Sequence, residues 1–262
     1  MEGSISQLDK EKNKNELNFN DLVVSTISKS HVGTNKFYEP KDNPNKIIRV
    51  ESFDELLDKH NNKIGIPNLV GTAKNLYKEL EEKYGIVAPV DFATSKDNHG
   101  KDVVCVITDK IEGQNLEKVE NGEEFVNKVE KLYSAVAKYF LDKSKDGGLY
   151  IWDINGESQY IYGKKLGDKE DKIYLIDTDI WLSKNKNDMY LSVYWLARHM
   201  SWLESKLGVK FTEARNSINE FINQPLPEDA EESVEKNIDG IRKIIAGEKS
   251  EYNPESAIPR FE

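Results

Sequence analysis

Residues Asp109–Leu116, which read DKIEGQNL, separate two parts of the sequence that differ in character. The part before them consists of short apolar runs bounded by turn residues, which is typical of β-strands. The part after them has long stretches with apolar residues at three- and four-residue spacing, which is typical of amphipathic helices. Strands followed by helices, rather than strands alternating with helices, predict an α+β protein in two lobes.

The first part is predicted to form an antiparallel sheet with one main helix. Apolar residues recur at helical spacing over 68–83, and Gly85 is the expected stop of that helix. Ser52 and Glu55 fit a capping box that opens a shorter helix over 53–60. The expected strands lie at 23–38, interrupted at Gly33, and at 46–50, 86–94 and 102–108, and the last two form a hairpin.

The second part is predicted to be mostly helical. Helices are expected at 123–141, at 189–207 with a stop at Gly208, at 212–222 and at 230–245. Three short strands are expected between the first two helices, at 149–152, 159–162 and 172–177. Residues 1–18 are polar and are expected to form a mobile tail. The lobes are therefore predicted at 19–113 and 114–262, with a linker at about 109–115.

Composition excludes several classes of function. The chain has 262 residues and a net charge of −10, which argues against a nucleic-acid or anionic-membrane partner, because phosphates are held by Lys and Arg. No apolar run approaches the ~20 residues of a membrane span. Cys105 is alone and the four histidines are scattered, which argues against disulfides and zinc sites. We expect a soluble protein of a reducing compartment, the cytoplasm.

Two aspartates stand directly after buried-type strands. They are Asp153, in YIWDINGESQ, and Asp177, in IYLIDTD. One interpretation is that each forms a turn at the end of its strand, which aspartate often does. The other is that the two lie near each other, where one accepts a hydroxyl proton and the other holds a divalent cation.

The order of these parts resembles the protein-kinase-like superfamily, closest in style to the branch of aminoglycoside and choline phosphotransferases. The resemblance spans about 28–202, and its most specific short match is the Ile-Glu-Gly of the linker. It implies a two-lobed fold, ATP and Mg²⁺ as cofactors, and phosphoryl transfer to a hydroxyl group. Asp153 then matches the catalytic-loop aspartate that orients the acceptor, and Asp177 matches the aspartate that holds Mg²⁺ on the phosphates.

The resemblance also implies a nucleotide site in the first lobe. The linker, from Asp109 through Ile111, would hydrogen-bond the adenine edge, with Ile47 packed on the base. The lysine of the family falls at Arg49, which on a strand shares a face with Ile47. The acidic partner of that cation would come from the main helix. Glu79 is preferred for this role, and Glu81 and Glu82 are the alternatives.

Several residues depart from the family pattern. Ser158 stands where the catalytic loop normally has an asparagine that binds a second metal ion, so Gln159 is the substitute ligand. The phosphate-covering loop keeps only Gly33, and arginine replaces lysine at Arg49, which is not a conservative change. We therefore hold two hypotheses. The first is an ATP- and Mg²⁺-dependent phosphotransferase for a small molecule or a protein; the second is a pseudokinase that serves as a binding module for a nucleotide or a protein.

Overall fold

The computed structural model describes residues 19–25, 36–54, 56, 66–120, 122–178, 180, 182–226 and 230–248. The predicted tail at 1–18, most of the short helix predicted at 53–60, and Gly33 lie outside these residues. The chain divides into two compact units, 1–74 with 89–110, and 75–88 with 111–262. The fold is α+β, as the sequence predicts. Residues 75–88, which the sequence analysis places in the first lobe, group with the second unit.

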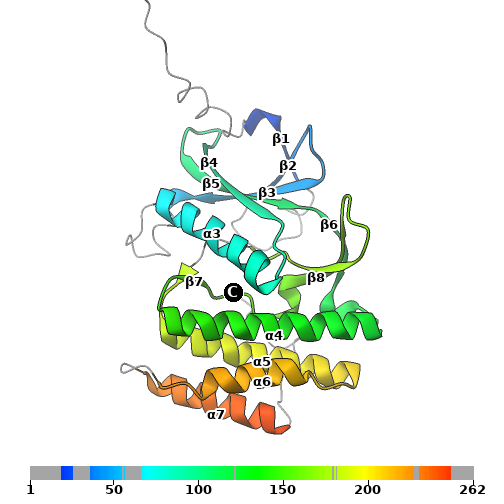
Figure 1. The fold of residues 1–262 in the computed structure, drawn as a ribbon. Coiled ribbons are helices and arrows are strands. Elements are labelled where there is room, and N and C mark those ends of the chain that lie inside the picture. Colours follow the sequence, from blue (N-terminus) through cyan, green and yellow to red (C-terminus); the bar gives the residue numbers. More distant parts are fainter. Residues whose placement is uncertain are drawn as a thin grey trace, which may run out of the picture. The chain divides into compact units, whose positions relative to one another are not determined.

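The first unit contains a five-stranded antiparallel sheet, in which Figure 1 draws β1, β2 and β3 in blue and β4 and β5 in blue-green. The strands follow the order β1-β2-β3-β5-β4. Their bounds are Leu22–Val24 for β1, Lys36–Pro40 for β2, Lys46–Ser52 for β3, Val90–Lys96 for β4 and Asp102–Asp109 for β5. The hairpin of β4 and β5 is confirmed, but β4 begins at Val90 rather than at 86. Pro89, which has no N–H to donate to the sheet, directly precedes it.

Alternate side chains of the strands face the hydrophobic core of this unit. Ile48, Val103 and Cys105 are almost completely buried and pack with Phe19 on one face of the sheet. Arg49, the neighbour of Ile48, therefore lies on the other face, because side chains alternate across a strand. Cys105 is a buried free cysteine, and burial raises the pKa of its thiol to about 12.

Helix α3, at Ile66–Tyr84, spans the division between the units. It matches the predicted main helix with small extensions at both ends. Gly85 follows it with φ of 71°, a left-handed conformation that glycine adopts without strain. Leu69, Ala73 and Leu80 are completely buried, which confirms the apolar stripe read from the sequence.

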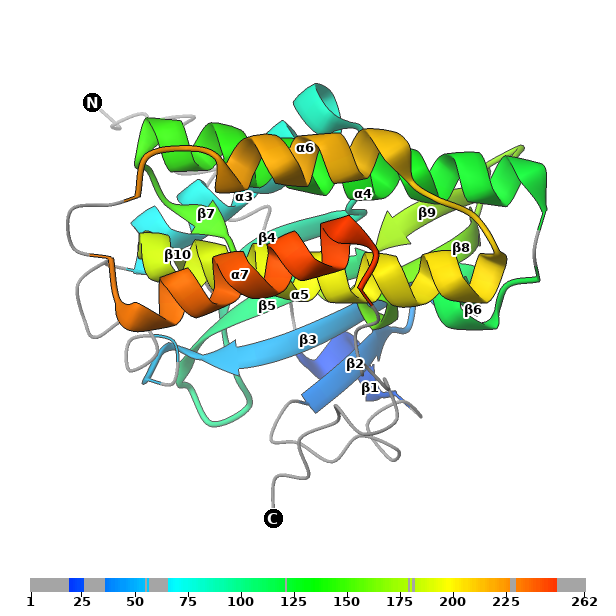
Figure 2. The ribbon, with the colours of Figure 1, turned by 90° about the horizontal axis from the view of Figure 1, so that it is seen from below.

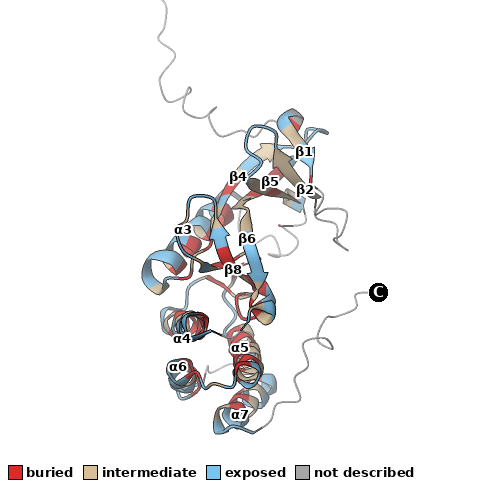
Figure 3. Cartoon of the chain, turned by 90° about the vertical axis from the view of Figure 1, so that its right-hand side faces the viewer, coloured by how far each residue is buried: buried red, intermediate tan, exposed pale blue. Residues whose placement is uncertain are grey.

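The second unit combines two small sheets with four further helices. The sheet β6-β8-β9 consists of Ile111–Asn115, Tyr160–Lys165 and Lys172–Leu175, and Tyr150–Ile151 (β7) pairs with Leu182–Ser183 (β10). The helices are Glu123–Asp146 (α4), Lys186–Leu207 (α5), Thr212–Ile222 (α6) and Glu232–Ala246 (α7). Figure 2 shows them lying roughly alongside one another. In Figure 3 their buried surfaces face inward and their exposed surfaces face outward.

The predicted linker at 109–115 contains the end of one strand and the start of another: β5 runs to Asp109, and β6 pairs with β8 from Ile111 onward. One helix of this unit differs from the prediction at its C-terminal end. Helix α4 continues past its predicted end at 141 to Asp146, where Gly147 caps it with φ of 68°. The predicted bounds of α6 are confirmed, and Gly208 stops α5 as predicted.

Candidate active site

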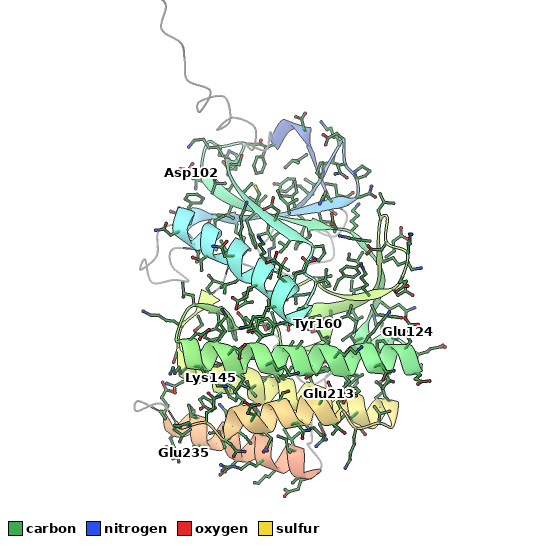
Figure 4. All side chains as sticks on the ribbon, viewed as in Figure 1. Asp102, Glu124, Lys145, Tyr160, Glu213 and Glu235 are labelled. Carbon is green, nitrogen blue, oxygen red and sulfur yellow. The ribbon has the colours of Figure 1, made fainter. Side chains whose placement is uncertain are left out.

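Strand β7 leads into the loop that carries Asp153. The strand is short, and buried hydroxyl groups hold it: Ile151 N donates to Tyr139 Oη at 2.8 Å, and Tyr150 Oη donates to the Asn185 carbonyl at 2.6 Å. Tyr160, labelled in Figure 4, donates its hydroxyl to the Ile154 carbonyl at 2.8 Å. Asp153 therefore lies in a loop whose two neighbouring strands are anchored by tyrosines.

Gln159 closes this loop through both ends of its amide. Its Nε2 donates to the Asp153 carboxylate and, at 3.0 Å, to the Asp153 carbonyl. Its Oε1 accepts from Gly156 N at 2.7 Å. The side chain is buried. In this geometry Gln159 orients the Asp153 carboxylate, and its role as a metal ligand stays a prediction.

The backbone of Gln159 brings Asp177 to the same place. Its carbonyl accepts from Ile176 N at 2.9 Å and from Asp177 N at 3.4 Å. The second aspartate thus lies two residues after the end of β9, beside the residue that orients the first. Asp177 is exposed, whereas Asp153 is half-buried. The backbone of Asp177, 24 positions along the chain from Asp153, therefore lies beside the loop that carries Asp153.

The electrostatics of Asp153 reflect this arrangement. Burial is the largest influence and raises the pKa of Asp153 above its ordinary value. The hydrogen bond from Gln159 opposes that shift, the negative charge of Asp177 adds to it, and His199 lowers the pKa. A carboxylate with a raised pKa is a stronger proton acceptor than an ordinary aspartate, which suits a general base.

A second acidic residue of the loop was not found by the sequence analysis. Glu157 is 3% exposed, and its Oε2 is in ion-pair contact with His199 Nδ1 on α5, although no straight hydrogen bond joins the two. His199 Nε2 lies over Gly156, 3.5 Å from where a Cβ at that position would be. In the sequence analysis His199 is only one of the four scattered histidines. The one sequence feature that could have pointed to this contact is Glu157, an acidic residue in the turn that follows Asp153.

The predicted cation of the first unit has a partner on its own strand. Arg49 Nη2 lies 2.9 Å from Glu51 Oε1, and both side chains are largely buried. Ile47 lies on the same strand at alternate spacing, so that it shares the face of Arg49 as predicted. Glu79, the preferred partner of Arg49, accepts from Lys143 Nζ at 2.6 Å. The pairing of Glu79 with Arg49 stays a prediction.

The two linker residues belong to different strands. Asp109 ends β5, where its carboxylate pairs with Lys46 and its N–H donates to the Pro89 carbonyl at 3.0 Å. Ile111 begins β6 and is half-buried. Adenine binding by this segment stays a prediction.

The candidate metal ligands of the site are Asp177 and Gln159. Among the residues that the structure describes, no three His, Cys, Asp or Glu side chains form a group that could hold a metal ion. A magnesium ion on nucleotide phosphates needs only one or two carboxylates from the protein. Asp177, with an exposed carboxylate beside a second acid, fits that requirement. Gln159 fits it less well, because Gly156 N already occupies one side of its amide oxygen.

Comparisons with known proteins add no family. No family model matches the sequence, and a search of the curated proteins found no match either. Within the described part of the chain, no helix has the length and apolar character that crossing a membrane requires.

Proposed function

We propose that the chain has a protein-kinase-like fold and transfers the γ-phosphoryl group of ATP to a hydroxyl group of a small molecule or a protein. The observation that supports this proposal is that Gln159 contacts both aspartates: its Nε2 donates to Asp153, and its carbonyl accepts from Asp177 N at 3.4 Å. The residues follow different strands, yet the charge of Asp177 raises the pKa of Asp153. A turn former at a strand end needs no such neighbour. We also propose a cytoplasmic location, since a single cysteine cannot form an internal disulfide.

Each aspartate has a role that suits its surroundings. Asp153, half-buried and held by Gln159, orients the acceptor hydroxyl and accepts its proton. Asp177, which is exposed, holds Mg²⁺ against the phosphates. A magnesium ion neutralises negative charge on the transferred phosphoryl group. Catalysis of phosphoryl transfer requires mainly this neutralisation and the positioning of the reacting groups. Ile47, Arg49, Asp109 and Ile111 would contact the nucleotide, as the resemblance implies.

The pairing of Arg49 with Glu51 favours the alternative function. An arginine whose charge a largely buried glutamate at 2.9 Å already balances is a weaker phosphate ligand than an unpaired lysine. The second candidate function is therefore a pseudokinase, which binds a nucleotide or a protein without transferring phosphate.

Nucleotide binding can be tested by thermal unfolding. With ATP and Mg²⁺ at 100 times the Kd, binding should add about 2.7 kcal/mol to the free energy of unfolding. Asp177→Asn should remove the part of that shift that depends on Mg²⁺. Asp239→Asn, on the exposed face of α7, removes the same charge at a residue 62 positions along the chain from Asp177 and should leave the shift unchanged. If millimolar ATP does not change the melting temperature, the proposal that the chain binds a nucleotide is wrong. The remaining hypothesis is then a pseudokinase that binds a protein.

Catalysis is tested separately at Asp153. Asp153→Asn keeps an oxygen that can accept from Gln159 but cannot take a proton, so transfer should fall by about 100-fold or more while ATP binding persists. The readout is release of ADP in the presence of a library of hydroxyl-bearing metabolites. If the parent protein binds ATP but transfers nothing to the library or to water, the pseudokinase function is favoured. If Asp153→Asn is as active as the parent, the role of Asp153 is wrong.

A further inference from the structure

A pocket in the second unit has an apolar lining and a cationic rim. It has a volume of about 320 Å³ and lies where the end of α3, the side of α4 and the start of β9 meet. Figure 2 shows β9 beside α4, and the two elements are in contact. Neither Asp153 nor Asp177 lines it. The volume is at the lower end of the range of small-molecule sites.

The apolar lining is held in place before any ligand arrives. Ile86 and Leu132 are buried, and Ile173 and Ala135 complete the wall between β9 and α4. Val87 bridges to β9, and its carbonyl accepts from Leu175 N at 2.9 Å. A preformed apolar wall binds a hydrophobic body at a small cost in conformational entropy.

The charged residues of the lining are all lysines. They are Lys128, Lys131 and Lys172, and no carboxylate is among the lining residues. Lys128 is engaged by Glu124 and by the Asp171 carbonyl, both at 2.6 Å, and Lys172 lies 3.6 Å from Asp168.

Lys131 differs from the other two lysines. Among the residues that the structure describes, no carboxylate lies within ion-pair distance of it. The chain as a whole has a net charge of −10, but the lining of this pocket is positively charged. The positive charge of Lys131 and the apolar lining together favour a ligand that has an apolar body and an anionic group.

We propose that this pocket binds a small organic anion, in which an apolar ring or chain contacts Ile86, Leu132 and Ile173 and an acidic group faces Lys131. Inorganic phosphate alone lacks the apolar body and should not bind. The proposal does not depend on the phosphotransferase function, because the pocket and the aspartate pair share no residue.

The test compares two probes with the same body. 2-Naphthoate carries the negative charge, and 2-naphthalenemethanol does not. Titration calorimetry with the full chain should show naphthoate binding at least about fivefold more tightly than the alcohol, which corresponds to one charge-assisted contact near the surface. Lys131→Gln should remove that preference. Lys138→Gln, an exposed lysine two turns along α4, is the matched control and should keep it.

A filled pocket provides the second test. Ala135→Trp should abolish binding of both probes, and circular dichroism will show whether the variant is folded. Because Lys131→Gln changes only a surface residue, the charge test stands even if Ala135→Trp does not fold. The proposal is overturned if naphthoate does not bind at millimolar concentration, if both probes bind equally, or if Lys131→Gln and Lys138→Gln behave alike.

Discussion

Asp153 shows how one residue gains a property from its surroundings. Its place after a strand could be read from the sequence, but its raised pKa results from burial and from the charge of Asp177. Because the pKa in the folded state lies above that in the unfolded chain, the folded protein holds this proton more tightly. The associated stability is complete at low pH and is lost as the pH rises through the folded-state pKa.

This sign gives a prediction for Asp153→Asn. The variant should melt at a higher temperature than the parent at pH 7.5, because it no longer buries a charged carboxylate. The difference should shrink as the pH falls towards 4, where the parent carboxyl becomes protonated. Thermal unfolding followed by circular dichroism across this range measures it. Asp239→Asn, on the exposed face of α7, is the control. A gain in the Asp153 variant that is equal at both ends of the range would contradict the assignment.

Helices α5, α6 and α7 are joined by one buried ion pair. Glu204 on α5 accepts from Arg215 Nε at 2.8 Å and from Phe211 N at 2.6 Å. Arg215, on α6, also donates to the carbonyls of Ile244 and Ile245 at the end of α7, at 3.2 and 2.9 Å. A cation here balances the partial negative charge of that helix end. The pair therefore fixes three helix ends at one point.

Glu204→Ala should lower the free energy of unfolding by about 3 kcal/mol, because it leaves a largely buried guanidinium and the N–H of Phe211 without their acceptor. The double variant Glu204→Ala/Arg215→Ala should cost less than the sum of the single changes. Urea unfolding measures both. Glu232→Ala removes an acid from an exposed pair on α7 and should cost less than about 1 kcal/mol. Additive effects of the buried pair would show that the two residues act independently.

The sheet β6-β8-β9 depends on two glycines that face each other. Gly113 on β6 is paired with Gly163 on β8, and a Cβ at Gly163 would lie 2.6 Å from the Gly113 Cα and overlap the Glu112 carbonyl. Gly163→Ala should therefore lower the free energy of unfolding by about 2 kcal/mol through overpacking. Gly148→Ala, where a Cβ meets nothing within 4 Å, should change it by less than about 1 kcal/mol. Equal denaturation midpoints for the two variants would refute the close approach.

At the scale of the whole molecule, α3 contributes residues to both units. The division falls between Lys74 and Asn75, inside a continuous helix with buried residues on both sides. Each unit has its own probe: Cys105 is buried in the first, and all four tryptophans belong to the second.

We expect both units to unfold in one transition, because α3 is one continuous helix that supplies buried residues to each unit, Leu69 and Ala73 to the first and Leu80 to the second. The midpoint in urea from thiol labelling of Cys105 should coincide with that from tryptophan fluorescence. Cys105→Ser, monitored by fluorescence, controls for any effect of the label. Labelling that is complete well below the fluorescence midpoint would show that the first unit unfolds alone.

The sequence by itself determined the α+β class, most helix bounds and the two candidate aspartates. Helix periodicity, the glycine stops after α3 and α5 and the turn residues around the β4–β5 hairpin are local signals, so they survive without knowledge of tertiary contacts. Tertiary structure alone decided that the expected linker is strand β6, that Glu79 meets Lys143, and that Glu157 meets His199. These pairings join residues that are far apart in the chain or buried by packing, and no local pattern specifies which distant side chain will fill a given space.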